Sequence, residues 1–189
     1  MNKLQIVLFY ILSFTWGAIM SVIGGIVGLI LTIAGHKPQR LGHVIYWQVG
    51  EGWGGVELGC FFVCSKDSGN HTKWHEAGHG IQNIWFGPLM PFIVCLPSAA
   101  RYWIREVKNI DLYVGLLFAI TTIVFGIIIT ITAVFNIVWL LVISIILTAY
   151  CYVVIGWLHF IERNNIRKPY DSVWFEGQAT ELGTKIFNK

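Results

Sequence analysis

Charged side chains are scarce in this chain, and two long stretches contain none. Of its 189 residues only 12% are charged while 56% are hydrophobic, and the mean hydropathy is +0.66. Soluble globular domains carry about twice that share of charged residues. This shortage argues against an ordinary soluble domain and indicates an α-helical integral membrane protein whose partner is the lipid bilayer.

The chain also lacks a strong net charge and a dense set of cysteines. The net charge is +3, and no run of Lys and Arg alternates with aromatic residues as in a basic binding groove, so we expect no nucleic-acid partner. The four cysteines fit neither a zinc knuckle nor a disulfide framework. Cysteines without such a pattern agree with a reducing compartment.

Two uncharged stretches predict three transmembrane helices. Leu4 to Ala34 exceeds the length needed to cross a hydrocarbon core of about 30 Å, so residues 1–35 form the first span. Leu112 to Ile161 would reach roughly 75 Å as one helix, and it must therefore fold back on itself. Asn136 is the turn former near its middle, which makes residues 112–161 a transmembrane helical hairpin.

Residues 36–111 are different in character and predict a small α+β region. His43–Val49 and Val56–Cys64 are β-rich runs separated by glycines, which is typical of a β-hairpin. The second run is either an edge strand that binds a substrate backbone or a cover over the site. Pro88, Pro91 and Pro97 argue against a spanning helix and favour an interfacial segment.

A His-Glu-x-x-His motif begins at His75 in this region. His75 and His79 are four residues apart and share one face of a helix, where two imidazoles can bind one metal ion. Glu76 lies beside them, where a carboxylate can take a proton from metal-activated water. Asn70 or Thr72 can cap this helix, and Gly87-Pro88 should end it near Phe86. The alternative is two surface histidines on an amphipathic helix.

A catalytic zinc site needs three protein ligands and one open position, so the two histidines require a partner. The downstream acidic candidates are Asp111, Asp171, Glu176 and Glu181. Two spans separate His79 from the C-terminal tail, residues 162–189, so the tail returns to the same side of the membrane as the motif. A third ligand from the tail is therefore compatible with the topology.

The tail carries a family resemblance. Glu176-Gly177-Gln178-Ala179-Thr180 resembles the Glu-x-x-Ala-Asp signature that follows His-Glu-x-x-His in membrane-embedded gluzincin peptidases of the heat-shock and CAAX prenyl protease type. The run from His75 to Gln82, together with Gly87-Pro88-Leu89 and Leu96-Pro97-Ser98, is similar to a set of small bacterial membrane proteins.

This resemblance implies a ligand set and a reaction. The zinc ligands would be His75, His79 and Glu176, the general base would be Glu76, and the substrate would be a peptide or protein. Thr180 departs from the family, which usually has Asp at this position, where the carboxylate would hydrogen-bond a ligand histidine. Loss of such a group weakens metal binding by about 10–100-fold, and Asp171 or Glu181 are candidates to compensate.

Basic residues predict the orientation. The spans are flanked on one side by Lys37, Arg40, Arg101, Arg105, Lys108, Arg163, Arg167 and Lys168. Lys3 is alone on the other side. The positive-inside rule then places the site in the cytoplasm and the N-terminus outside, in an inner or plasma membrane.

The sequence thus predicts a membrane-bound zinc metalloendopeptidase. A site-2-type intramembrane protease with Asp111 as third ligand is the alternative enzyme. A non-catalytic membrane scaffold or interaction protein, with or without zinc, is the alternative outside enzymology.

Overall fold

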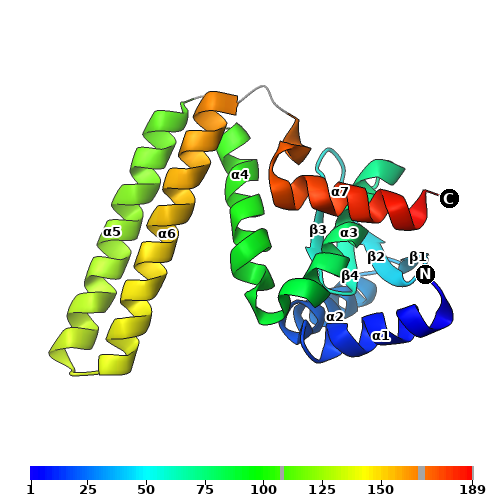
Figure 1. Ribbon diagram of the computed structural model, residues 1–189, viewed down its shortest axis with the longest axis horizontal. Helices are drawn as coiled ribbons and strands as arrows, with labels where there is room; N and C mark the ends of the chain where they lie inside the picture. The colour runs from blue at the N-terminus through cyan, green and yellow to red at the C-terminus, as the bar shows by residue number, and fades with distance from the viewer. Residues whose placement is uncertain (107–108, 166–168, 189) are drawn as a thin grey trace. The chain divides into compact units, whose positions relative to one another are not determined.

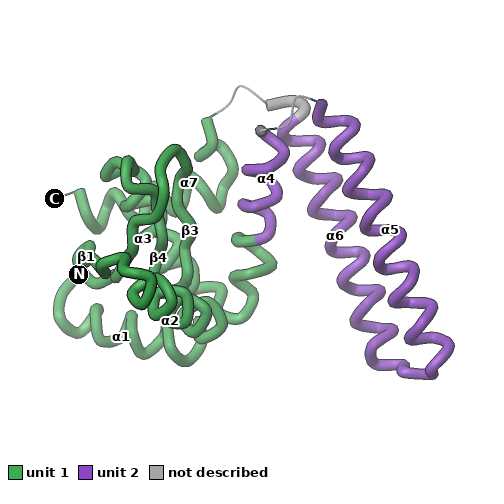
Figure 2. Tube along the Cα trace, turned by 180° about the vertical axis from the view of Figure 1, so that it is seen from behind, with its two compact units in different colours: residues 1–95, 169–189 green, residues 96–168 purple. Residues whose placement is uncertain are grey.

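The computed structural model describes residues 1–106, 109–165 and 169–188. The chain is mostly helical, with one small mixed sheet. It divides into two compact units, which Figure 2 shows in different colours. The first unit combines Met1–Cys95 with Pro169–Lys189, and the second is Leu96–Lys168. The first unit is therefore assembled from two segments that are far apart in the sequence.

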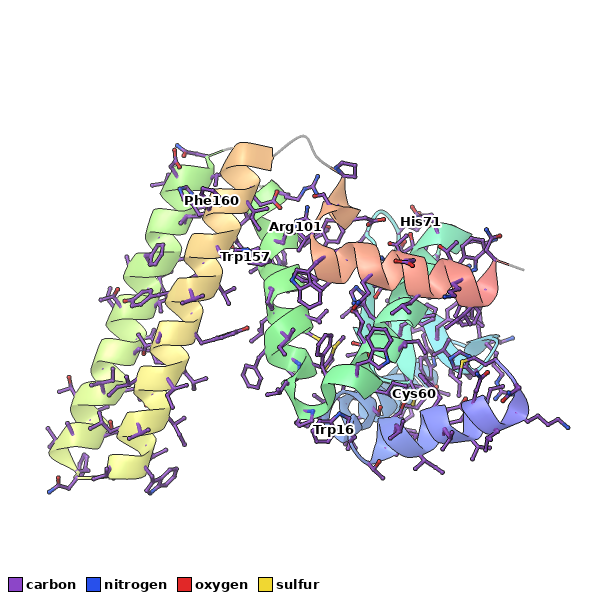
Figure 3. All side chains as sticks on the ribbon, viewed as in Figure 1. Trp16, Cys60, His71, Arg101, Trp157 and Phe160 are labelled. Carbon is purple, nitrogen blue, oxygen red and sulfur yellow. The ribbon has the colours of Figure 1, made fainter. Side chains whose placement is uncertain are left out.

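Two helices occupy the first apolar stretch, where a single transmembrane helix was expected. Helices α1 (Lys3–Phe14) and α2 (Ala18–Ile33) are bent by 92° at the break between them. The expectation of one continuous helix was wrong, because tertiary contacts of Gly17 stabilise a break between the two helices. A Cβ on Gly17 would lie 2.4 Å from Nδ2 of Asn83, and that amide donates to the Gly17 carbonyl. Figure 3 shows Trp16 at this bend.

The sheet has four strands in the order β1-β2-β4-β3. Its strands are β1 (Gln39–Leu41), β2 (Val44–Gln48), β3 (Gly55–Leu58) and β4 (Phe61–Cys64). The hairpin expected between His43–Val49 and Val56–Cys64 was wrong, because β2 and β4 pair in parallel. The second run is itself a hairpin of β3 and β4, which turns at Gly59 with a φ of 78°.

Helix α2 packs along this sheet through its small residues. A Cβ on Gly24 would lie 2.3 Å from the Leu58 carbonyl oxygen, and one on Gly28 would lie 2.3 Å from the Trp47 ring. These two glycines therefore allow close approach of a sheet. Between α1, the sheet and α3 lies the core of the unit, formed by Phe9, Val44, Tyr46, Cys60, Phe62, Cys64, Ala77 and Ile81.

Helix α3 (Asn70–Phe86) carries the His-Glu-x-x-His motif. It ends at Gly87, whose φ of 55° confirms the expected end of the helix. Its N-cap is Gly69 without a side-chain hydrogen bond, so the expected caps Asn70 and Thr72 were wrong. The proline-containing segment continues as two short helical turns, η1 (Gly87–Leu89) and η2 (Pro91–Cys95).

The C-terminal segment returns to α3 as η3 (Tyr170–Ser172) and α7 (Trp174–Phe187). In Figure 1, α7 lies on one side of α3 and α1 lies on the other. The first unit is thus layered, with α3 and the sheet between the N-terminal helices and α7.

The second unit contains α4 (Leu96–Glu106), α5 (Ile110–Val134) and α6 (Val138–Asn165). Asn136 has a φ of 55° and forms the turn between α5 and α6, which confirms the expected hairpin. Ile110–Val134 and Val138–Glu162 are long and apolar enough to cross a membrane, and two bent helix pairs elsewhere in the described chain raise the number of candidate spans to at most four.

Candidate metal centre

The close contact of α3 with α7 positions the candidate site. A Cβ on Gly78 would lie 1.9 Å from the Ala179 carbonyl oxygen, and one on Gly183 would lie 1.8 Å from that of Trp74. Glycine at both positions lets the two backbones touch. This contact brings Glu176, in the first turn of α7, beside the middle of α3.

Three buried groups converge at this contact. Nε2 of His75 lies 3.1 Å from Oε2 of Glu176 and 3.1 Å from Nε2 of His79, and Nε2 of His79 lies 3.2 Å from the same carboxylate oxygen. Ligands bound at about 2.1 Å to a tetrahedral metal ion are about 3.4 Å apart, which is close to this spacing. The group can therefore hold a metal ion.

His79 is oriented by Gln82, one turn further along α3. Nε2 of Gln82 donates to the Phe175 carbonyl at 2.8 Å and to Oε1 of Gln178 at 2.9 Å. Its other amide atom, Oε1, must then accept from Nδ1 of His79, at 2.7 Å. The proton of neutral His79 is therefore on Nδ1, and Nε2 keeps its lone pair for a metal ion.

His75 is oriented by a relay of two side chains. The Thr180 hydroxyl donates to Oδ2 of Asp171 at 2.9 Å, so it must accept from Nδ1 of His75, at 2.8 Å. Nε2 of neutral His75 is therefore also left with its lone pair. The hydroxyl of Thr180 thus connects His75 to the carboxylate of Asp171.

The chemistry of these donors fits a cation. Two imidazole lone pairs and a carboxylate oxygen point at one another in a buried site, and such acceptors repel unless a proton or a metal ion lies between them. Burial lowers the pKa of His79, but its hydrogen bond to Glu176 and the nearby carboxylates outweigh burial and raise that pKa to about 9. Protons and metal ions therefore compete for the same position.

Glu76 lies beside the three groups and against the sheet. It is buried, and burial raises the pKa of its carboxyl above the usual range. A Cβ on Gly55 would lie only 2.6 Å from Cγ of Glu76, so β3, which ends the strand order, runs directly past this carboxylate.

Glu57 is a further acidic residue near the site, and the sequence analysis did not identify it. It points from β3 into the protein, accepts a hydrogen bond from the Gly59 amide and lies 3.9 Å from Sγ of Cys95. Burial raises the pKa of Glu57 to about 8. The sequence feature that could have identified Glu57 is an acidic side chain within the β-rich run Val56–Cys64.

The acidic candidates from the sequence have different locations. Glu176 joins the two histidines, whereas Asp111 lies in the second unit, 3.5 Å from Nε2 of His159. Glu181 is exposed on α7, and Asp171 lies behind Thr180. The sequence analysis gave Gln82 no role in the site. Its position three residues after His79 could have indicated one, because side chains at this spacing are neighbours on a helix.

No family model matches the chain, and no curated protein or solved structure is significantly similar to it. The described residues show a buried His75, His79 and Glu176 group that is consistent with a His-Glu-x-x-His motif completed by a downstream glutamate.

Proposed function

We propose that the protein is a membrane-bound zinc endopeptidase, with His75, His79 and Glu176 as zinc ligands. The observation that carries this proposal is the convergence of three buried donor atoms within 4.8 Å of one another, with both histidine tautomers set by hydrogen bonds. Two imidazole nitrogens and one carboxylate oxygen are a ligand set typical of catalytic zinc.

Zinc bound there would polarise the scissile carbonyl and make water acidic enough to react near neutral pH. Glu76 takes the proton of the attacking water and passes it to the leaving amine. A pKa raised by burial suits both steps, because the carboxyl group must be a base first and an acid afterwards.

Strand β3 is suited to hold the substrate. It is the terminal strand of the sheet, and Gly55 places its backbone next to the Glu76 carboxylate. An extended peptide that pairs with this edge would be aligned beside the catalytic base. Helices α5 and α6 anchor the protein in the bilayer, and the basic residues near the spans favour a cytoplasmic site.

Replacement of Glu76 by glutamine tests the catalytic step. Glu76→Gln should retain bound zinc while peptide hydrolysis falls by about 10²–10⁴-fold, since only the proton transfer is removed. The matched control is Glu181→Gln, on the exposed surface of α7, which should leave both quantities unchanged. The measurements are metal content of the detergent-purified protein and cleavage of a peptide library.

The same measurements separate the alternatives. Full zinc in a Glu176→Gln variant, together with loss of zinc in Asp111→Asn, would favour the site-2-type arrangement. Zinc with no hydrolysis in the wild-type protein would indicate a structural metal in a scaffold protein.

A further inference from the structure

The outer faces of α1 and α2 both carry exposed apolar side chains, and together they are here called the floor. In α2, Ile19, Ile26 and Ile33 recur on the exposed side, whereas Ser21, Gly24 and Gly28 on the opposite side are buried against the unit. The same division occurs in α1, where Phe9 and Ser13 are buried while Leu8, Ile11 and Leu12 are exposed. Figure 3 shows side chains projecting from the outer side of α1.

The floor has the opposite polarity to a surface that faces water. No charged residue occurs from Leu4 to Ala34, so the exposed side carries large aliphatic groups where a soluble protein has charges. Basic residues occur just outside this stretch, at Lys3, Lys37 and Arg40, and all three are exposed. An apolar face with basic residues at its borders complements a lipid bilayer with anionic headgroups.

Neither helix of the floor is long enough to cross that bilayer alone. At 1.5 Å per residue, the 12 residues of α1 reach about 18 Å and the 16 residues of α2 about 24 Å, less than a hydrocarbon core of about 30 Å. The bend of 92° sets the two helix axes nearly perpendicular, so their lengths do not add along one direction.

The sheet gives an independent reason. It is attached along α2, since Trp47 Nε1 donates to Thr32 Oγ1 at 3.1 Å and the Gln48 carbonyl contacts Nδ1 of His36 at 3.1 Å. If α2 stood across the membrane, this open sheet, with exposed Gln39 and Arg40 on its edge strand, would lie in hydrocarbon. Open sheet edges do not occur there.

We infer that α1 and α2 lie in the membrane surface as an interfacial anchor and that the chain crosses the bilayer only twice, through α5 and α6. The N-terminal residues then lie on the same side as the His75, His79 and Glu176 group. This is the opposite of the orientation that a spanning first helix would give. Residues of α3 and α7 form that group, and α7 covers the side of α3 away from α1 (Figure 1).

Protease protection of epitope tags tests the number of crossings. Tags are placed before Met1, after the exposed Gly52, after Asn136 and after Lys189 in the full chain, which is studied in oriented vesicles. The tags at Met1, Gly52 and Lys189 should be digested from one side and the Asn136 tag only from the other. Digestion of the Met1 tag or the Gly52 tag from the side of the Asn136 tag would overturn the proposal, because it would mean that one or both bent helix pairs cross the bilayer. The readout does not involve hydrolysis by the protein, so it is independent of the proposed function.

Photo-crosslinking identifies what covers the floor. A photoreactive amino acid at Ile26 should yield lipid adducts, as should the same group at Ile123 on α5, while at the exposed Glu181 of α7 it should not. A crosslinked dimer from Ile26 without lipid adducts would mean that a second copy covers the floor. That result would reject the interfacial anchor.

Discussion

At the scale of single residues, the two histidines of the motif are held by different groups. His79 is bound to an amide of its own helix, whereas His75 depends on Thr180 and, through it, on Asp171. A hydroxyl carries no charge, but it transmits the influence of the Asp171 carboxylate to the imidazole. Threonine at position 180 is therefore compatible with a group that can hold a metal ion.

This relay predicts that the carboxylate of Asp171 can be moved to position 180 without loss of zinc binding. Thr180→Val and Asp171→Asn should each weaken zinc binding, by about 10–100-fold for Thr180→Val, because the His75 ring loses its orientation. The double variant Thr180→Asp, Asp171→Asn should bind zinc as well as the wild type, since one carboxylate then contacts His75 directly. Competition with a zinc chelator measures these affinities. Unchanged affinity in Asp171→Asn would contradict the relay.

Glu57 predicts a pH dependence of stability. Its folded-state pKa of about 8 lies above the ordinary value of 4.5, so the folded protein favours the neutral form. The contribution of Glu57 to the free energy of unfolding is therefore fully present below pH 4.5. It decreases by roughly 4 kcal/mol as pH rises toward 8. In metal-free protein, Glu57→Gln should reduce this decline between pH 5 and 9, whereas the exposed control Glu181→Gln should not. Equal slopes in thermal melts of both variants would reject the assignment.

At the scale of elements, the contact of α3 with α7 depends on two glycines. The motif helix alone supplies two of the three donor groups, and α7 supplies the third only because Gly78 and Gly183 let the backbones touch. The spacing between these helices therefore determines whether the site exists.

A single methyl group should disturb this contact. Gly78→Ala would force α7 away from α3, which should lower stability by about 1–3 kcal/mol and weaken zinc binding by moving Glu176. Gly126→Ala, at a position in α5 with open space around it, is the matched control and should leave both quantities unchanged or slightly improve stability. Zinc affinity and thermal melting in detergent measure the two effects, and wild-type affinity in Gly78→Ala would contradict this account.

At the scale of the whole molecule, the candidate metal centre joins two distant parts of the chain. His79 and Glu176 are 97 residues apart in the sequence, and the helical hairpin lies between them. A metal ion bound there would stabilise the folded first unit in proportion to the logarithm of its concentration.

Removal of the metal ion should therefore destabilise the first unit and leave the helical hairpin unchanged. Chelation should lower the melting temperature of the first unit and speed amide hydrogen exchange in α7, while exchange in α5 and α6 remains unchanged. At a free zinc concentration 1,000 times the dissociation constant the stabilisation is about 4 kcal/mol. Exchange in α7 that does not respond to chelation would argue against a metal bound by Glu176.

The sequence by itself determined the local features of this protein. The motif spacing, the end of α3 at Gly87 and the turn at Asn136 follow from short-range geometry and were expected correctly. Uncharged stretches long enough to cross a bilayer predicted α5 and α6 for the same reason.

The tertiary structure decided everything that depends on residues distant in the chain. Hydropathy does not distinguish one straight transmembrane helix from a bent pair of helices. The break at Gly17 is therefore evident only in the tertiary structure, where Gly17 contacts Asn83. Local propensity does not specify strand partners, and β2 pairs in parallel with β4. The relay from His75 to Asp171 likewise requires α7 to be docked, because hydrogen-bond partners are chosen by proximity in space and not by order along the chain.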